Sequence, residues 1–156
     1  MNKAKQVYVT YIRSTREKVW DAITNPEVTR QYWGHNNVSE WKPGATWEHR
    51  RVSNSSVDIA GKVIETSPPK RLVISWANPA NLHDADKVSR VTFDLEDMVD
   101  LVRLTVTHDE LEPDSDMLRG INRGWPLVLS SLKSLLETGK PIDIMNLKSS
   151  PDAGNL

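Results

Sequence analysis

Helical segments near both ends of the chain, with strand-like sequence between them, constrain the fold most. Residues 14–33 (STREKVWDAITNPEVTRQYW) predict two short helices, and residues 120–140 (GINRGWPLVLSSLKSLLETGK) belong to a long one. The long helix carries an apolar stripe at helical spacing, formed by Leu118, Ile121, Trp125, Val128, Leu132 and Leu135. Such a stripe must be covered, and the predicted sheet is the only large candidate. The sequence therefore predicts a sheet wrapped around a helix.

Capping residues predict where the short helices begin and end. Ser14 and Glu17 match the S-x-x-E capping box, which satisfies free N–H groups at the start of a helix. Asn25 stops this first helix and caps the next one, because Pro26 suits the first position of a helix. The second helix is expected to end at Trp33.

The long helix is predicted to begin at Asp114 or Ser115 and to end at Gly139 and Pro141. Pro126 lies inside its pattern, where it removes one backbone hydrogen bond and crowds the preceding turn. We therefore expect a kink or a restart of the helix close to this proline.

Six strands are predicted from β-branched and aromatic residues and from the alternation of apolar with polar side chains. They are residues 6–13, 45–52, 57–65, 71–77, 88–95 and 101–108. Short turns between them favour antiparallel pairing of consecutive strands. Residues 34–44 and 78–87 are interpreted as loops, and a tight connection is expected to begin at residue 96.

Length and charge bound the class of protein. The 156 residues suit a single domain at residues 1–148, followed by a disordered tail at residues 149–156. Residues 142–147 are expected to pack on the domain or to form an oligomer contact. The net charge of −1 argues against dedicated nucleic-acid binding. No apolar run reaches the ~18 residues of a membrane span, and no signal peptide is present, so a cytoplasmic protein without membrane contact is expected.

Several kinds of chemistry lack support in the sequence. No cysteine is present, which excludes disulfides, thiolate zinc sites and cysteine nucleophiles. There is no G-x-S-x-G elbow, no phosphate-binding glycine loop and no H-E-x-x-H motif. Residues 83–86 (HDAD) are interpreted as a solvated loop, because no regular spacing would bring their side chains together as metal ligands. Neither a metal nor a cofactor is predicted.

Four segments of the chain resemble a known family. They are VWDAITNPE with the following YW, SPPKRLVISW, RLTVTHDEL and GWPLVLSSLKSLLE. In this order and at these separations they resemble the homologues of the heat-shock-protein-90 ATPase activator, a family of the START-like (SRPBCC) superfamily. The resemblance covers residues 8–139. It implies an α+β helix-grip fold: a curved antiparallel sheet around a long C-terminal helix, two short helices after the first strand, and a cavity between sheet and long helix.

The resemblance also implies positions for particular residues. Trp20 matches a core position of the first helix, Trp33 a position near the cavity mouth, and Trp76 an inward-pointing position at a strand end. Gly61 matches a strand glycine that another segment approaches closely. Gly124-Trp125 matches the place in the last helix where the kink is expected.

One charged strand offers candidates for a polar site. If Trp47 faces the cavity, the two-residue period of a strand puts His49 and Arg51 on the same face. An imidazole and a guanidinium beside an apolar pocket could orient a polar group of a ligand. A register shifted by one residue would instead turn Glu48 and Arg50 inward.

Other polar residues within strands have less defined roles. His108 shares the alternation of Leu104 and Val106, yet it ends its predicted strand, where capping or a surface contact is equally expected. Asp58 and Arg90 are expected to form surface cross-strand pairs.

Three functions follow as hypotheses. The first is binding of an apolar or aromatic small molecule, lipid- or polyketide-like by resemblance, in the cavity between sheet and helix. Its wall would consist of Trp33, Trp47, Trp76, Phe93, Ile121, Trp125 and Leu129, with His49 or Arg51 orienting a polar group. The second is a cyclase- or hydratase-like enzyme that uses His49. The third is a module that contacts heat-shock-protein-90 or a second copy of the chain.

Overall fold

The computed structural model describes residues 2–148, which hold seven strands and three α-helices. The first part contains β1 (Ala4–Ile12), α1 (Arg16–Thr24), α2 (Pro26–Trp33), β2 (His35–Ser39), β3 (Thr46–Arg51) and β4 (Val57–Ser67). The second contains β5 (Arg71–Trp76), the 3₁₀ turns η1 (Pro79–Asn81) and η2 (Ala85–Lys87), β6 (Ser89–Met98), β7 (Leu101–Leu111) and α3 (Asp116–Thr138). The predicted tail at residues 149–156 lies outside the described residues.

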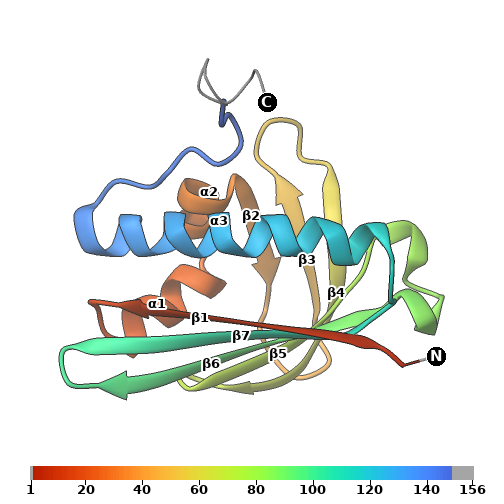
Figure 1. The fold of residues 1–156 in the computed structure, drawn as a ribbon, viewed down its shortest axis with the longest axis horizontal. Helices are drawn as coiled ribbons and strands as arrows, with labels where there is room; N and C mark the ends of the chain where they lie inside the picture. Colours follow the sequence, from red (N-terminus) through yellow and green to blue (C-terminus); the bar gives the residue numbers. More distant parts are fainter. Residues whose placement is uncertain (1, 149–156) are drawn as a thin grey trace.

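The strands form one antiparallel sheet in the order β1-β7-β6-β5-β4-β3-β2. Consecutive strands pair from β2 to β7, and the N-terminal strand β1 pairs with β7. The sheet curves around α3, which runs along its concave face, while α1 and α2 lie at one end (Figure 1). This is the predicted helix-grip fold. Within residues 2–148, none of the helices is long and apolar enough to cross a membrane.

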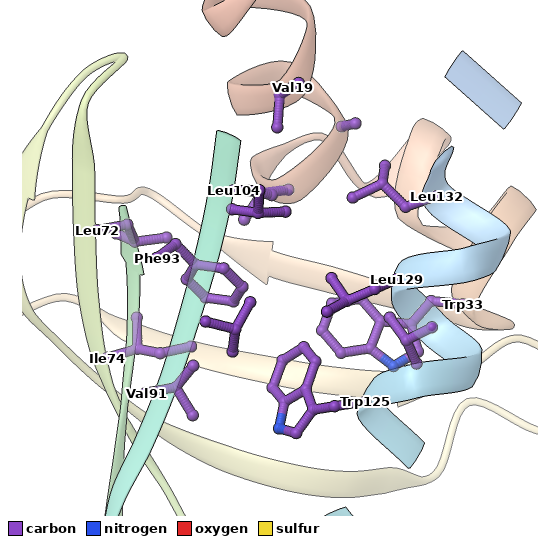
Figure 2. Close-up of a cluster of buried hydrophobic side chains, with 14 of the residues drawn as sticks. Val19, Trp33, Leu72, Ile74, Val91, Phe93, Leu104, Trp125, Leu129 and Leu132 are labelled. Atoms are coloured by element: carbon purple, nitrogen blue, oxygen red, sulfur yellow. The ribbon is translucent and has the colours of Figure 1, made fainter. Parts of the chain in front are cut away.

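The core lies between the inner face of the sheet and α3. Leu72, Phe93 and Leu104 point from the strands toward α3, which contributes Leu129 and Leu132 (Figure 2). All five side chains are buried. The face of α3 that carries the predicted apolar stripe is therefore the face that the sheet covers.

The short helices begin at hydrogen-bonding caps, with one difference from the prediction. Thr15, not Ser14, caps α1, and its hydroxyl accepts a hydrogen bond from the N–H of Lys18 at 3.2 Å. Both residues carry the hydroxyl that a cap needs, but Thr15 has the extended backbone of the cap position (φ −112°, ψ 157°). Asn25 caps α2 as predicted, because its side-chain oxygen accepts from the N–H of Glu27 at 3.0 Å.

The long helix α3 has the predicted ends but no interruption. Ser115 caps it by accepting from the N–H of Leu118 at 3.1 Å, and Gly139 ends it in the left-handed conformation at φ +81°. The helix is continuous through Pro126, so the predicted restart is wrong. Packing along the rest of the helix outweighs the single backbone hydrogen bond that proline removes.

The strand β2 lies in a segment that the sequence predicts as a loop. It pairs with β3 along its whole length, from His35 opposite Arg51 to Ser39 opposite Trp47. Its sequence, HNNVS, has no apolar alternation, and the residues that it buries are His35 and Asn37. A strand whose inward residues are polar gives no signal to pattern reasoning, which explains the wrong assignment.

The register of β3 is the one that turns the aromatic side chains inward. Trp47 and His49 are buried, whereas Arg50 is exposed and Glu48 is half-buried. The alternative with Glu48 and Arg50 on the inner face is therefore wrong.

The carbonyl group of Ser75 on β5 is in close contact with Gly61 on β4 and with Trp47 on β3. A Cβ at Gly61 would lie 2.6 Å from the carbonyl carbon of Ser75 and closer still to its oxygen, so the expected tight contact is confirmed. The same oxygen accepts a hydrogen bond from the indole N–H of Trp47 at 2.7 Å. Only glycine leaves room for this backbone contact.

The hairpin of β6 and β7 is longer than predicted. β6 continues to Met98, and the tight turn falls at Val99-Asp100, with φ +66° at Asp100. The residues at this end of the hairpin face solvent, where a strand needs no apolar alternation. β7 likewise continues to Leu111, which places His108 inside the strand and not at its end.

The segment after α3 packs on the domain as a tail. Ile142 forms two hydrogen bonds with the hydroxyl of Ser131, at 2.8 and 3.1 Å, and Ile144 packs against the core. Met145 occupies the space that a side chain at Gly34 would need.

Candidate functional site

A cavity of about 540 Å³ lies between the first half of α3 and one end of the sheet. Its lining comes from α2, β2, β3, β4, β5, α3 and the loop after β5. The lining residues are Trp33, His35, His49, Arg51, Asp58, Ile59, Trp76, Asn78, Asp116, Met117, Gly120, Ile121, Gly124, Trp125 and Val128. One part of the lining is aromatic and an adjoining part is charged, so the cavity offers two different surfaces to a ligand.

Three tryptophans form the aromatic wall. The ring centroid of Trp33 lies 5.4 Å from that of Trp125 and 6.4 Å from that of Trp76, and the latter two are 5.6 Å apart. Each comes from a different element, and each is less than one tenth exposed. Figure 2 shows Trp33 and Trp125 side by side, below Leu129. The wall is therefore assembled only when α2, β5 and α3 come together.

His108 lies behind the aromatic wall and holds two of its members. The indole N–H of Trp125 donates to Nδ1 of His108 at 3.0 Å, and Nε2 lies 2.8 Å from the hydroxyl oxygen of Ser89. That hydroxyl donates to the carbonyl oxygen of Trp76 at 2.8 Å. Because an indole only donates and a carbonyl only accepts, Nδ1 is unprotonated and Nε2–H donates to Ser89.

The imidazole of His108 is neutral. It is fully buried, and this burial lowers its pKa to about 3. The ring takes part in the packing and hydrogen bonding of the core. The sequence-based expectation that it caps the strand or makes a surface contact is therefore wrong. Another buried donor in this region, the indole N–H of Trp76, has no hydrogen-bond partner among residues 2–148.

The charged wall is organised by one carboxylate oxygen, Oδ2 of Asp58. It accepts from Nε2 of His35 at 2.7 Å and from Nε and Nη2 of Arg51 at 3.1 and 3.0 Å. Nδ1 of His35 lies 3.0 Å from the carbonyl oxygen of Trp33. Both ring nitrogens of His35 therefore face hydrogen-bond acceptors, and the carboxylate of Asp58 joins His35 to the guanidinium of Arg51.

A β-bulge brings Asp58 into this cluster. His49 pairs with Ile59 and the next residue, Arg50, pairs with Val57, so Asp58 is the extra residue of β4. An extra residue in a strand re-aims its side chain. Asp58 forms the expected cross-strand pair, with Arg51, but the pair is partly buried at the cavity and includes His35, which the alternation rule did not indicate.

His49 lies at the centre of the charged wall and stacks on His35. The two ring centroids are 3.8 Å apart and the planes differ by 8°. Nδ1 of His49 donates to Oδ1 of Asn37 at 2.5 Å. Burial, then the positive charges of His35 and Arg51, hold the pKa of His49 well below 6.5.

Coulomb's law disfavours a positive charge on both stacked rings. Two positive charges ~4 Å apart repel each other by about 4 kcal/mol at an effective dielectric constant of ~20. With Nδ1 protonated toward Asn37, Nε2 of His49 carries a free lone pair. None of the residues that the structure describes donates a hydrogen bond to it.

Six of the nine residues predicted for the site line the cavity, and three do not. Those in the lining are Trp33, His49, Arg51, Trp76, Ile121 and Trp125. Trp47, Phe93 and Leu129 are buried in the core instead. Trp47 packs behind Trp76 with ring centroids 5.5 Å apart, and Phe93 meets Trp125 edge to face at 5.9 Å. All three side chains lie between the sheet and α3. The sequence pattern indicates which side chains point inward, but it does not indicate whether they reach the cavity or the closely packed part of the core.

Nine of the fifteen lining residues were not predicted, and four of them shape the site: His35, Asp58, Gly120 and Gly124. His35 was hidden in the unrecognised strand β2, and Asp58 in the bulge. Gly120 and Gly124 lie on α3, and no heavy atom lies within 4 Å of a Cβ built at either position. Two glycines in a strong helix were a usable signal, because such glycines usually have a packing or functional reason.

The other polar expectations have clear outcomes. Arg90 forms the expected surface pair with Asp109 at 2.7 Å. His83 is exposed in the loop between η1 and η2. Within residues 2–148, no three His, Cys, Asp or Glu side chains are placed to hold a metal ion. Trp20 is partly buried and packs against the core.

The fold and the cavity define a helix-grip protein with an open space between sheet and long helix. The sequence profile described as "Activator of Hsp90 ATPase homolog 1-like protein" matches residues 13–137. The chain belongs to this family. No protein of curated function matches its sequence.

Several solved structures share the fold. The Aha1 dimer from Colwellia psychrerythraea is 23% identical, with a TM-score of 0.74 over 88% of this chain and 98% of that chain. DynU16, a protein of the dynemicin biosynthetic locus, is 21% identical, with a TM-score of 0.70 over 88% of this chain and 48% of that chain. PFC0360w, an HSP90 activator from Plasmodium falciparum, is 20% identical, with a TM-score of 0.64 over 78% and 86%.

Proposed function

We propose that this protein binds an apolar or aromatic small molecule in the cavity between α3 and the sheet. The observation that carries the proposal is the wall of three tryptophans beside a space of about 540 Å³. Sites of roughly 300–1,000 Å³ with mainly apolar walls and a few polar groups are typical of small-molecule binding. DynU16, which shares the fold, belongs to a biosynthetic locus, and this supports a small-molecule ligand.

The free energy of burial sets the affinity that this wall supports. An aromatic body of tryptophan size buries roughly 150–250 Å², which is worth about 4–6 kcal/mol. Part of this is lost when the ligand is immobilised, and a dissociation constant of about 1 mM already corresponds to about −4 kcal/mol. Apolar burial alone therefore supports weak binding, and tighter binding needs the charged wall as well.

A cyclase- or hydratase-like reaction is a second candidate, because His49 lines the cavity with an unprotonated Nε2. Its lowered pKa makes it a weak proton acceptor, which favours binding over catalysis.

A chaperone contact is a third candidate, supported by the family description and by the Plasmodium HSP90 activator of similar fold. It predicts capture of heat-shock-protein-90 by the purified chain. The Aha1 dimer of similar fold supports a homodimer in the same way. Both contacts are compatible with an occupied cavity.

A substitution that fills the cavity tests the binding proposal. Gly124 lines the cavity and has open space around its Cβ position, so Gly124→Leu should occupy the site without a clash. Leucine also favours a helix over glycine by about 0.5–1 kcal/mol, so the variant should fold. Calorimetric titration with naphthalene should show binding to the wild type and at least tenfold weaker binding to Gly124→Leu.

The matched control is Ser130→Leu, which adds the same side chain to an exposed position of α3 away from the cavity. It should bind naphthalene like the wild type. Equal binding by all three proteins would contradict the proposal.

A further inference from the structure

The charged wall of the cavity contains an unpaired hydrogen-bond acceptor. Nδ1 of His49 donates to Oδ1 of Asn37, so Nε2 holds the free lone pair of the neutral ring. His49 lines the cavity and is only 4% exposed. Nε2 is not among the enclosed unpartnered side-chain atoms of residues 2–148, so it is open to the cavity, where a ligand donor can take the place of water.

The charges around His49 are already paired with one another. One oxygen of Asp58 accepts from His35 and from two nitrogens of Arg51. His35 uses its second N–H on the carbonyl oxygen of Trp33. The guanidinium of Arg51 has five N–H donors and lines the cavity, so the donors that Asp58 does not use are left for solvent or a ligand. His49 and Arg51 lie two residues apart on β3 and both line the cavity. The wall therefore presents one acceptor beside spare donors.

We propose that the ligand carries a hydroxyl on its aromatic or conjugated ring, and that this hydroxyl donates to Nε2 of His49 while its oxygen accepts from Arg51. This inference rests on the proposed function and names the ligand class as phenols and enols. A hydroxyl both donates and accepts through a single atom, which matches a wall with an acceptor next to donors.

Other polar groups match this wall less well. A carboxylate only accepts, so one of its oxygens would face the lone pair of His49, and the guanidinium of Arg51 is already neutralised in part by Asp58. Ethers and ketones lack the donor altogether. The hydroxyl also keeps its proton, because His49 is buried, stacks on His35 at 3.8 Å and lies near Arg51, and this setting holds the pKa of His49 well below 6.5. The site recognises a hydroxyl and does not deprotonate it.

A series of ligands with one ring system separates these groups. Calorimetric titration of the wild-type protein with naphthalene, 2-methoxynaphthalene, 2-naphthol and 2-naphthoate varies only the substituent. We expect 2-naphthol to bind roughly tenfold more tightly than 2-methoxynaphthalene, the scale of one net hydrogen bond. We expect 2-naphthoate to bind more weakly than 2-naphthol.

The substitution His49→Phe links the preference to the named acceptor. It keeps a ring against His35 and Trp33 and removes Nε2, so the advantage of 2-naphthol over 2-methoxynaphthalene should disappear. His83→Phe, at an exposed histidine outside the cavity, should keep the full advantage. If His49→Phe does not fold, the affinities of the four ligands for the wild-type protein still test whether the site prefers a hydroxyl group.

Each outcome has a defined meaning. Equal affinities for 2-naphthol, 2-methoxynaphthalene and naphthalene would overturn the hydroxyl inference and leave the proposed function standing. Tightest binding of 2-naphthoate would make Arg51 the anchor and would also overturn it. Binding of none of the four compounds would overturn the proposed function together with the inference.

Discussion

The indole N–H of Trp125 donates a hydrogen bond to Nδ1 of His108 at 3.0 Å, and this bond ties the aromatic wall of the cavity to strand β7. The same imidazole reaches the carbonyl oxygen of Trp76 through the hydroxyl of Ser89. One buried ring thus holds two of the three wall tryptophans. The shape of the cavity depends on hydrogen bonds behind its wall as well as on packing.

Removing this ring should destabilise the protein. In His108→Leu, the indole N–H of Trp125 and the hydroxyl of Ser89 lose their buried partner. Ser89 keeps its bond to the carbonyl of Trp76, but the indole N–H of Trp125 is left unpaired, so the free energy of unfolding should fall by about 1–3 kcal/mol in urea titrations. His83→Leu, at an exposed histidine, should change it by less than about 0.5 kcal/mol. Equal unfolding midpoints for the two variants would contradict this role of His108.

The same ring predicts how stability depends on pH. The pKa of His108 is about 3 in the folded protein, against 6.5 as its ordinary value, so between these values the unfolded chain binds the extra proton. Its contribution is therefore complete above pH 6.5 and is lost as pH falls toward 3. At pH 5 the loss should reach about 2 kcal/mol. His49, with its pKa also lowered, acts in the same direction. Urea titrations at pH 7 and pH 5 check this, and His108→Gln should show a smaller difference than the wild type.

Two glycine substitutions should have opposite effects on stability. Gly61→Ala places a methyl group against the backbone of Ser75, where neither strand can give way, and should cost at least about 2 kcal/mol. Gly124→Ala places it in open space on a helix and should stabilise by about 0.5–1 kcal/mol. Thermal unfolding should show a lower midpoint temperature than the wild type for Gly61→Ala and a higher one for Gly124→Ala. A tolerated Gly61→Ala would show that β4 and β5 are not in the close contact described.

Changing Asp58 should change the preferred ligand. Asp58→Asn removes the only carboxylate that contacts His35 and Arg51 among residues 2–148 and leaves the guanidinium of Arg51 at the cavity without a counter-charge. A hydrogen bond to a charged group is worth about 1.5–3 kcal/mol, so 2-naphthoate should bind at least roughly tenfold more tightly than to the wild type. Asp94→Asn, which breaks a surface pair with Arg71 outside the cavity, should leave this affinity unchanged. An unchanged affinity in Asp58→Asn would show that Asp58 does not set the charge of the site.

The fold was largely predictable, because its elements carry strong local signals. The apolar stripe of α3, the cap at Asn25 and the alternation around Phe93 all agree with their final positions. The prediction failed where neighbours override local preference. The polar strand β2 exists because β3 pairs with it, and α3 continues through Pro126 because the rest of the helix is packed.

The site was predictable on its aromatic side and much less on its charged side. Trp33, Trp76 and Trp125 were identifiable as large inward residues. His35 and Asp58 were not, because one lies on a strand without apolar alternation and the other in a bulge that breaks the two-residue period. The sequence also could not show which inward residues line the cavity, because this depends on where α3 and the sheet move apart.

The most direct test of ligand binding uses the indole N–H signals of the six tryptophans in a nitrogen–proton NMR spectrum, recorded while 2-naphthol is added. Trp33, Trp76 and Trp125 line the cavity, whereas Trp20 and Trp41 do not, and the indole N–H of Trp41 is held by the carbonyl of Thr24 at 2.8 Å. We expect the first three signals to shift in a saturable way and the signals of Trp20 and Trp41 to stay in place. Shifts confined to Trp20 and Trp41, or no saturable shift at all, would contradict a ligand site in this cavity.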